Sequence, residues 1–148
     1  MTVIDEINSI YDYVKVLYPT SSIARQDVPQ EPAANTFVIV SQYSDVKTET
    51  GASYVNDREF QLIYYGTSSV DVLTKMSELS RKLNNDEKLI PLRGSSRYIR
   101  VKGFSYGSVF KSQSGIPYSI AVMQTETREA RDLPTETKIS DVSVATKE

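Results

Sequence analysis

The sequence predicts an α+β domain in which two helices cover one face of an antiparallel sheet of about four strands. Two observations predict this class. Two segments carry apolar residues at helical spacing, and two strand-like stretches follow each of them. Strands that are adjacent along the chain favour antiparallel pairing, and helices set apart from them favour a two-layer sandwich. The predicted order of elements is therefore α-β-β-α-β-β.

The first predicted helix begins after Thr2, which can cap it together with Asp5 three residues later. Pro19 stops the helix, and the proline-bearing segment 20–35 is predicted to be an extended loop. The buried stripe of this helix recurs at spacings of three and four residues and consists of Val3, Ile7, Ile10, Val14 and Leu17.

A β-hairpin is predicted to follow this loop. Its first strand contains the apolar run Phe37–Val40, and its second strand spans Arg58–Tyr65. The connection KTETGASYVN between them, residues 47–56, is longer than a tight turn needs. We therefore expect the hairpin to project beyond the sheet.

The second helix is predicted to start at Ser68, after Gly66 ends the preceding strand, and to stop at Asn84 and Asn85. Residues 86–96 are predicted to be a loop that leads into a third strand, Tyr98–Phe104. The fourth strand is expected to pack against the helices over Ile116–Met123, with one buried face formed by Ile116, Tyr118, Ile120 and Val122.

This last strand continues after its apolar face has ended, through Gln124, Glu126 and Arg128. A polar tail follows, and its only apolar anchors are Ile139, Val142 and Val144. We predict one domain over residues 1–131 and a C-terminal tail or arm over residues 132–148.

Composition excludes most catalytic chemistry. The 148 residues contain neither histidine nor cysteine, which removes His-dependent triads, the usual zinc sites, thiol chemistry and disulfides. No nucleophile–base pair can be assembled, so we expect a protein that is not an enzyme and needs no cofactor or metal. No apolar run is long enough to span a bilayer, and we expect a cytosol-like compartment.

A basic cluster is the only candidate for contact with nucleic acid. It comprises Arg93, Arg97, Arg100 and Lys102. A phosphate-binding role would favour a small nucleic-acid-binding module. The simpler interpretation is a strand with a solvated charged face, and the formal net charge of −2 favours that interpretation.

Three features suggest contacts with other subunits: the projecting hairpin, the long last strand and the tail. Each is extended backbone without an obvious partner inside the domain, and open sheet edges pair readily with other chains. The candidate interface residues are Lys47, Glu49, Gly51 and Tyr54 in the hairpin, Gln124, Glu126 and Arg128 in the strand, and Ile139, Val142 and Val144 in the tail.

The succession of segments resembles the tail terminator (tail completion, neck terminator) proteins of tailed bacteriophages. The likeness lies in "VKVLYP", then "RQDVPQEPAANTFVIV", then "REFQLIYYGTSSVDVLTKMSELSRKL", then "RYIRVKGFSYGSV" and "GIPYSIAVMQTETRE". It covers nearly the whole chain to about Arg131, and its most specific part is "YYG" leading into a Ser-capped helix.

The resemblance implies a structural virion protein at the head–tail joint, assembled in the host cytoplasm. It implies a ring, of six subunits in this family, that caps the tail-tube protein and stops its polymerisation. The ring would present a docking surface to head-completion and neck proteins while DNA passes through its channel without specific recognition. Another head–tail connector or head-closure ring protein is the alternative within the same class.

Overall fold

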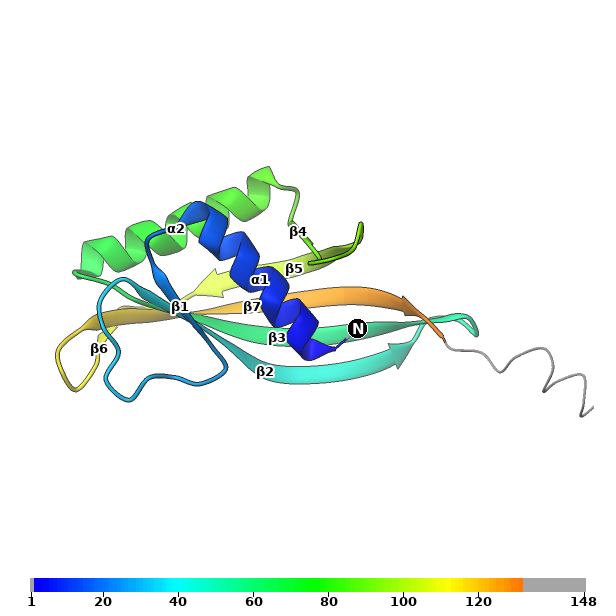
Figure 1. Cartoon of the computed structure of the whole chain (residues 1–148), viewed down its shortest axis with the longest axis horizontal. Coiled ribbons are helices and arrows are strands. Elements are labelled where there is room, and N and C mark those ends of the chain that lie inside the picture. The colour runs from blue at the N-terminus through cyan, green and yellow to red at the C-terminus, as the bar shows by residue number, and fades with distance from the viewer. Residues whose placement is uncertain (1, 132–148) are drawn as a thin grey trace, which may run out of the picture.

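The computed structural model describes residues 2–131, which fold into two helices and one sheet (Figure 1). The helices are α1 (Val3–Leu17) and α2 (Ser69–Asn85). The strands are β1 (Ser22–Arg25), β2 (Thr36–Thr48), β3 (Ser53–Tyr65), β4 (Leu89–Pro91), β5 (Tyr98–Tyr106), β6 (Phe110–Lys111) and β7 (Pro117–Ala130). The sheet order is β1-β2-β3-β7-β5-β4, and β6 also pairs with β7.

The predicted α+β class with two helices is confirmed, but the predicted sheet is wrong in strand number and in pairing. The sheet has seven strands and is mixed, because β1 runs parallel to β2 while the other pairs are antiparallel. The additional strands β1 and β4 lie in segments that were predicted to be loops, and β6 lies between the third and fourth predicted strands. Each has two to four residues, which is too short for an alternating pattern to identify a strand.

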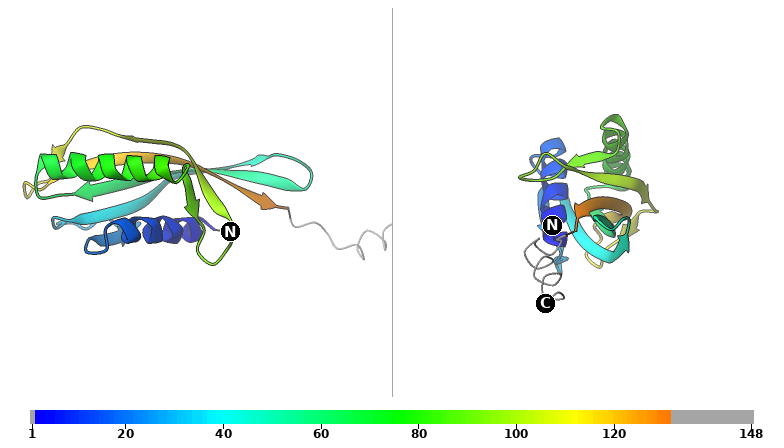
Figure 2. Two further views of the ribbon diagram at one scale, coloured as in Figure 1. Left: turned by 90° about the horizontal axis from the view of Figure 1, so that it is seen from above. Right: turned by 90° about the vertical axis from the view of Figure 1, so that its right-hand side faces the viewer.

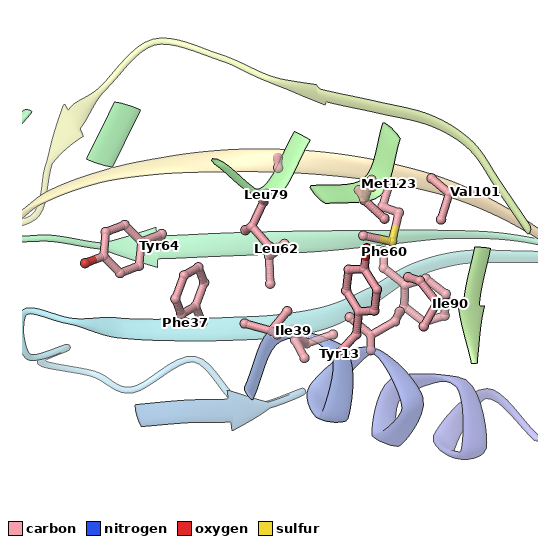
Figure 3. Close-up of a cluster of buried hydrophobic side chains, with 14 of the residues drawn as sticks. Tyr13, Phe37, Ile39, Phe60, Leu62, Tyr64, Leu79, Ile90, Val101 and Met123 are labelled. Carbon is pink, nitrogen blue, oxygen red and sulfur yellow. The ribbon is translucent and has the colours of Figure 1, made fainter. Parts of the chain in front are cut away.

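Both helices pack on the same face of the sheet, and the main core lies between them and the strands (Figures 2 and 3). From α1 the core includes Ile10 and Val14, and from α2 it includes Met76 and Leu79. The strands contribute the labelled side chains in Figure 3, among them Phe37, Ile39, Phe60, Leu62, Tyr64, Val101 and Met123. The sequence predicted this arrangement, in which both helices cover one face of the sheet.

The predicted buried face of the last strand is wrong. The side chains of β7 that face the helices are the other alternates, Ser119, Ala121, Met123, Thr125 and Thr127, all 2% exposed or less. The apolar alternates, including Tyr118 and Ile120, belong to a second cluster that contains no helix residue. The sheet is strongly curled into a half-barrel. On its helix-free face, side chains of β1, β2, β3 and β7 pack against one another and form the second cluster.

The junction between β3 and α2 requires a residue without a side chain. A Cβ atom added at Gly66 would lie 2.6 Å from Asp71 Oδ2 and 2.8 Å from Val72 Cγ2. The Ser68 hydroxyl accepts a hydrogen bond from the Asp71 amide at 3.1 Å, so the predicted cap of α2 is confirmed. Tyr64 donates to Asp71 Oδ2 at 2.8 Å, which ties the end of the strand to the first turn of the helix.

Candidate assembly interface

Three strands extend together beyond the helices and form an arm (Figures 1 and 2). We define this strand arm as residues 44–48 of β2, residues 53–58 of β3 and residues 125–130 of β7. Its strands stay in continuous antiparallel register from Ser44 opposite Arg58 to Thr48 opposite Tyr54, and β7 follows β3 on the other side. The projecting hairpin is thus one part of a broader structure.

The polar end of the last strand has a partner inside the chain. Glu126 lies opposite Asp57 and Arg128 lies opposite Val55, both on β3. This backbone was expected from the sequence to have no partner within the domain, and that expectation is wrong for the side that faces β3. On its other side, β5 pairs with β7 only as far as Glu126.

The turn at the tip of the arm is held by local hydrogen bonds. The Thr50 hydroxyl accepts bonds from the amides of Ala52 and Ser53, each at 3.0 Å. Arg128 Nε donates to Glu49 Oε2 at 2.6 Å, so two of the residues predicted for an interface pair with each other. The Arg128 guanidinium holds the pKa of Glu49 below its ordinary value. These contacts give the tip a defined shape within the single chain.

The helix-free face of the arm carries a network of charges that bridges several strands. Asp57 on β3 accepts from Lys47 of β2 at 3.1 Å and from Lys102 of β5 at 2.9 Å. The hydrogen bond from Lys102 is the main reason why the pKa of Asp57 lies below its ordinary value. Lys47, another predicted interface residue, is therefore bound to the side of the arm and does not project freely from it.

The base of the arm is attached to the first helix through a buried polar cluster. Glu6 of α1 forms an ion pair with Arg58 of β3, and both side chains are almost completely buried. The Thr127 hydroxyl donates to Glu6 Oε2 at 3.2 Å, and Asn56 donates to Glu129 at 2.8 Å. Sequence reasoning missed this cluster because Glu6 and Arg58 each resemble ordinary surface charges in the sequence.

The remaining predicted hairpin residues lie at or near the tip. Gly51 is exposed, and a Cβ atom added there would meet nothing within 4 Å. The Tyr54 ring lies beneath the guanidinium of Arg131, whose Cζ is 5.9 Å from the ring centroid.

The third residue predicted for an interface on the last strand, Gln124, is exposed on the helix-free face, opposite Glu59. The tail residues Ile139, Val142 and Val144 lie outside the described residues.

The structure does not bring the basic cluster together as one patch. Arg93 makes two contacts with Asp12 of α1, at 2.6 and 2.7 Å, and Lys102 binds Asp57. Arg100 lies opposite Glu126 on the neighbouring strand. Arg97 is exposed in the loop before β5. Carboxylates therefore neutralise much of the positive charge that this cluster would need in order to bind a phosphate backbone.

A groove between the helices and β4 is a feature that the sequence did not predict. It has a volume of about 670 Å³ and is lined in part by Val16, Pro91 and Tyr98. The Tyr13 hydroxyl donates to Asp86 at 2.6 Å within it, and burial together with this bond raises the pKa of Tyr13. Among residues 2–131 there is no group of three or more acidic, histidine or cysteine side chains that could hold a metal ion.

Comparisons with known proteins support the fold and nothing finer. No family model and no curated protein matches the chain. One similar solved structure is 13% identical, with a TM-score of 0.52, and the match covers 91% of this chain and 99% of that chain. The name of that protein states neither a family nor an activity. Neither helix within the described residues is long and apolar enough to cross a membrane.

Proposed function

We propose that this protein is a structural component of a bacteriophage tail, of the tail terminator type. It assembles into a ring, of six subunits according to the family resemblance, that sits on the last ring of tail-tube protein at the head–tail joint. There it ends tube polymerisation and offers a surface to head-completion and neck proteins. It acts by assembly, without catalysis, cofactor or membrane.

The strand arm is the observation that carries this proposal. It projects beyond both helices, and among the described residues its outer strands each have an edge without a strand neighbour: β2 from Ser44 to Thr48, and β7 from Thr127 to Ala130. A head-to-tail ring needs two different surfaces on each subunit, because each contact joins one patch to another patch on the next copy. The two edges of the arm lie on opposite sides of β3 and meet this requirement.

The charge distribution is compatible with the passage of DNA through the ring. The net charge is −2, and several basic side chains are paired with carboxylates. A channel with a strong basic excess would hold DNA through its phosphates. The same pairing weakens the alternative of a nucleic-acid-binding module that uses Arg93, Arg97, Arg100 and Lys102.

The experiment is a polymerisation assay with the tail-tube protein of the same phage. Tubes form with increasing amounts of this chain, and electron microscopy measures their lengths. We expect shorter tubes that carry an end cap. A matched control is a variant in which Asn-Gly replaces Thr48–Tyr54, which should leave tube length unchanged. Tubes unaffected by the wild-type chain would contradict the proposal, and cross-links only to portal or adaptor proteins would favour a connector ring.

A further inference from the structure

The outer edge of β2 is covered at one end and open at the other. The parallel strand β1 pairs with β2 only from Thr36 to Ile39. Gln26 then ends this cover, because its amide donates to the Ile39 carbonyl at 2.6 Å and its side-chain oxygen accepts from the Ser41 amide at 3.0 Å. From Ser44 to Thr48, no other strand of residues 2–131 lies along this edge.

Hydrogen bonds identify the backbone groups that point out of this edge. The Val46 amide donates to the side chain of Asp45 at 2.9 Å and is therefore turned away from β3. The Glu49 amide donates to the Ser53 carbonyl, so the odd-numbered residues here face β3. Since direction alternates along an antiparallel strand, the amides and carbonyls of Ser44, Val46 and Thr48 face outward. They form a site for one added strand.

The side chains along this edge favour a partner. Tyr43 and Val46 are 53% and 59% exposed, which is unusual for large apolar side chains on an open strand. Lysines often protect edges from pairing, but the side chain of Lys47 is held by Asp57 on the helix-free face. The edge therefore combines backbone that has no strand neighbour with exposed apolar side chains, and the Val46 amide would exchange its bond to Asp45 for one to the added strand.

We infer that this edge binds residues Ile139–Val144 of a second copy of the chain as an added strand. The inference rests on the proposed ring and names the contact that joins its subunits. Residues 139–144, ISDVSV, place Val142 and Val144 on one side of an extended strand. Tyr43 and Val46 project from opposite faces of β2, since Tyr43 lies opposite Glu59 and Val46 opposite Asn56. Val142 and Val144 of the added strand would cover Val46, while its backbone pairs with Ser44, Val46 and Thr48.

The position of Arg131 places the start of the tail on the side of the arm away from the β2 edge of its own chain. Its amide donates to the Ala52 carbonyl at 2.7 Å, so the tail leaves the arm at its tip on the β7 side of β3. The β2 edge lies on the opposite side of β3. In a head-to-tail ring, the β7 side of one subunit faces the β2 side of the next. The seven residues between Arg131 and Ile139 reach roughly 25 Å when extended, so the segment is long enough for the β2 edge of its own chain or of the next. The head-to-tail ring favours the next chain, and the double cysteine variant below distinguishes the two.

Chemical cross-linking tests this contact directly, because the chain contains no cysteine. A tagged full-length Val46→Cys protein and an untagged Val142→Cys protein are mixed under assembly conditions and treated with a short bismaleimide. We expect a linked tagged–untagged pair in the assembled fraction. Val70→Cys replaces Val46→Cys as the control, since Val70 is 74% exposed on α2, away from the arm. A link of equal yield to the Val70→Cys protein would overturn the inference.

Proline substitutions test the backbone pairing. Val144→Pro, placed in the Val142→Cys protein, and Ser44→Pro, placed in the Val46→Cys protein, each remove one amide. The amide of Ser44 faces away from β3, so the β2–β3 ladder should survive. We expect both to lower the yield of the link between positions 46 and 142 severalfold, whereas Ser44→Ala should not. Thermal unfolding confirms that each variant is folded. A double variant Val46→Cys and Val142→Cys that links only within one chain would contradict exchange between subunits.

The failure of this inference can be separated from the failure of the proposed function. If the wild-type chain assembles and caps tubes but no link forms, the inference is wrong and the proposed function stands. If the wild-type chain neither assembles nor shortens tubes, the proposed function is wrong and the inference falls with it.

Discussion

Glu6, in the first turn of α1, forms a buried ion pair with Arg58 on β3, at the base of the strand arm. Thr127 of β7 donates to the same carboxylate oxygen at 3.2 Å, so one side chain of the helix contacts two of the three strands of the arm. Within the described part of the chain, Glu6 Oε1 and Arg58 Nε have no hydrogen-bond partner. The pair therefore fixes the position of the arm against the helix at a considerable cost in desolvation.

Removal of one member of this pair should destabilise the fold strongly. Glu6→Ala leaves the Arg58 charge buried without a partner, and we expect the free energy of unfolding to fall by about 3–5 kcal/mol. The double variant Glu6→Leu with Arg58→Met should recover most of this loss, since it removes both charges. Urea denaturation measures both variants. A double variant no more stable than Glu6→Ala would show that the charges themselves are required.

Asp57 should make the arm sensitive to acid. Its pKa in the folded state lies below the ordinary value of 3.8, chiefly because Lys102 donates to it. Its ionised form thus contributes stability above about pH 4, and this contribution is lost as the pH falls through the lowered folded-state pKa.

We expect Asp57→Asn to cost about 1 kcal/mol at pH 7 and progressively less below pH 4. Thermal unfolding at several pH values checks this expectation. Substitution of the exposed Asp27 by asparagine provides a control and should change stability by less than about 0.5 kcal/mol. A cost for Asp57→Asn that is the same at pH 7 and pH 3 would contradict the assigned role of Asp57.

Gly66 should tolerate no side chain. Gly66→Ala places a methyl group 2.6–2.9 Å from atoms of Asp71, Val72 and Tyr64, and we expect a loss of about 1–3 kcal/mol from overpacking. Gly51→Ala is the matched control, because its Cβ atom would meet nothing within 4 Å. Equal melting temperatures for the two variants would contradict the close packing at the β3–α2 junction.

The tip of the arm should matter for assembly and little for folding. Replacement of Thr48–Tyr54 by Asn-Gly closes the hairpin at the pair Lys47–Val55 and removes no residue of either core cluster. We expect a change in unfolding free energy of about 1 kcal/mol or less and a clear loss of oligomer in sedimentation velocity. If stability falls as much as assembly does, the tip is part of the folded core and not an interface.

The sequence predicted those parts of the fold that depend on local chemistry. The Thr2–Asp5 capping box, the Ser68 cap and the hairpin of β2 and β3 are all present. Each depends on residues within a few positions of one another, or on a long apolar pattern. The prediction that both helices cover one face of the sheet is also confirmed. It depended on the apolar stripe of each helix, which is a long apolar pattern of this kind.

The sequence could not predict features set by distant pairing. The buried face of β7 carries Ser119, Thr125 and Thr127, whose hydroxyls bond distant groups: the carbonyls of Gly107 and Arg58 and the carboxylate of Glu6. The apolar alternates Tyr118 and Ile120 pack instead against side chains of β2 and β3 on the helix-free face. The partner of the polar end of β7, which is β3, is likewise fixed only by the register of the whole sheet.

The central claim is that this chain works as a ring at the end of a tail tube. Native mass measurement of the full-length protein, alone and with its tail-tube protein, tests the claim most directly. The account predicts a species of about six times the 16.6 kDa chain mass, alone or in complex with tube protein. A protein that remains a monomer under both conditions would contradict the account.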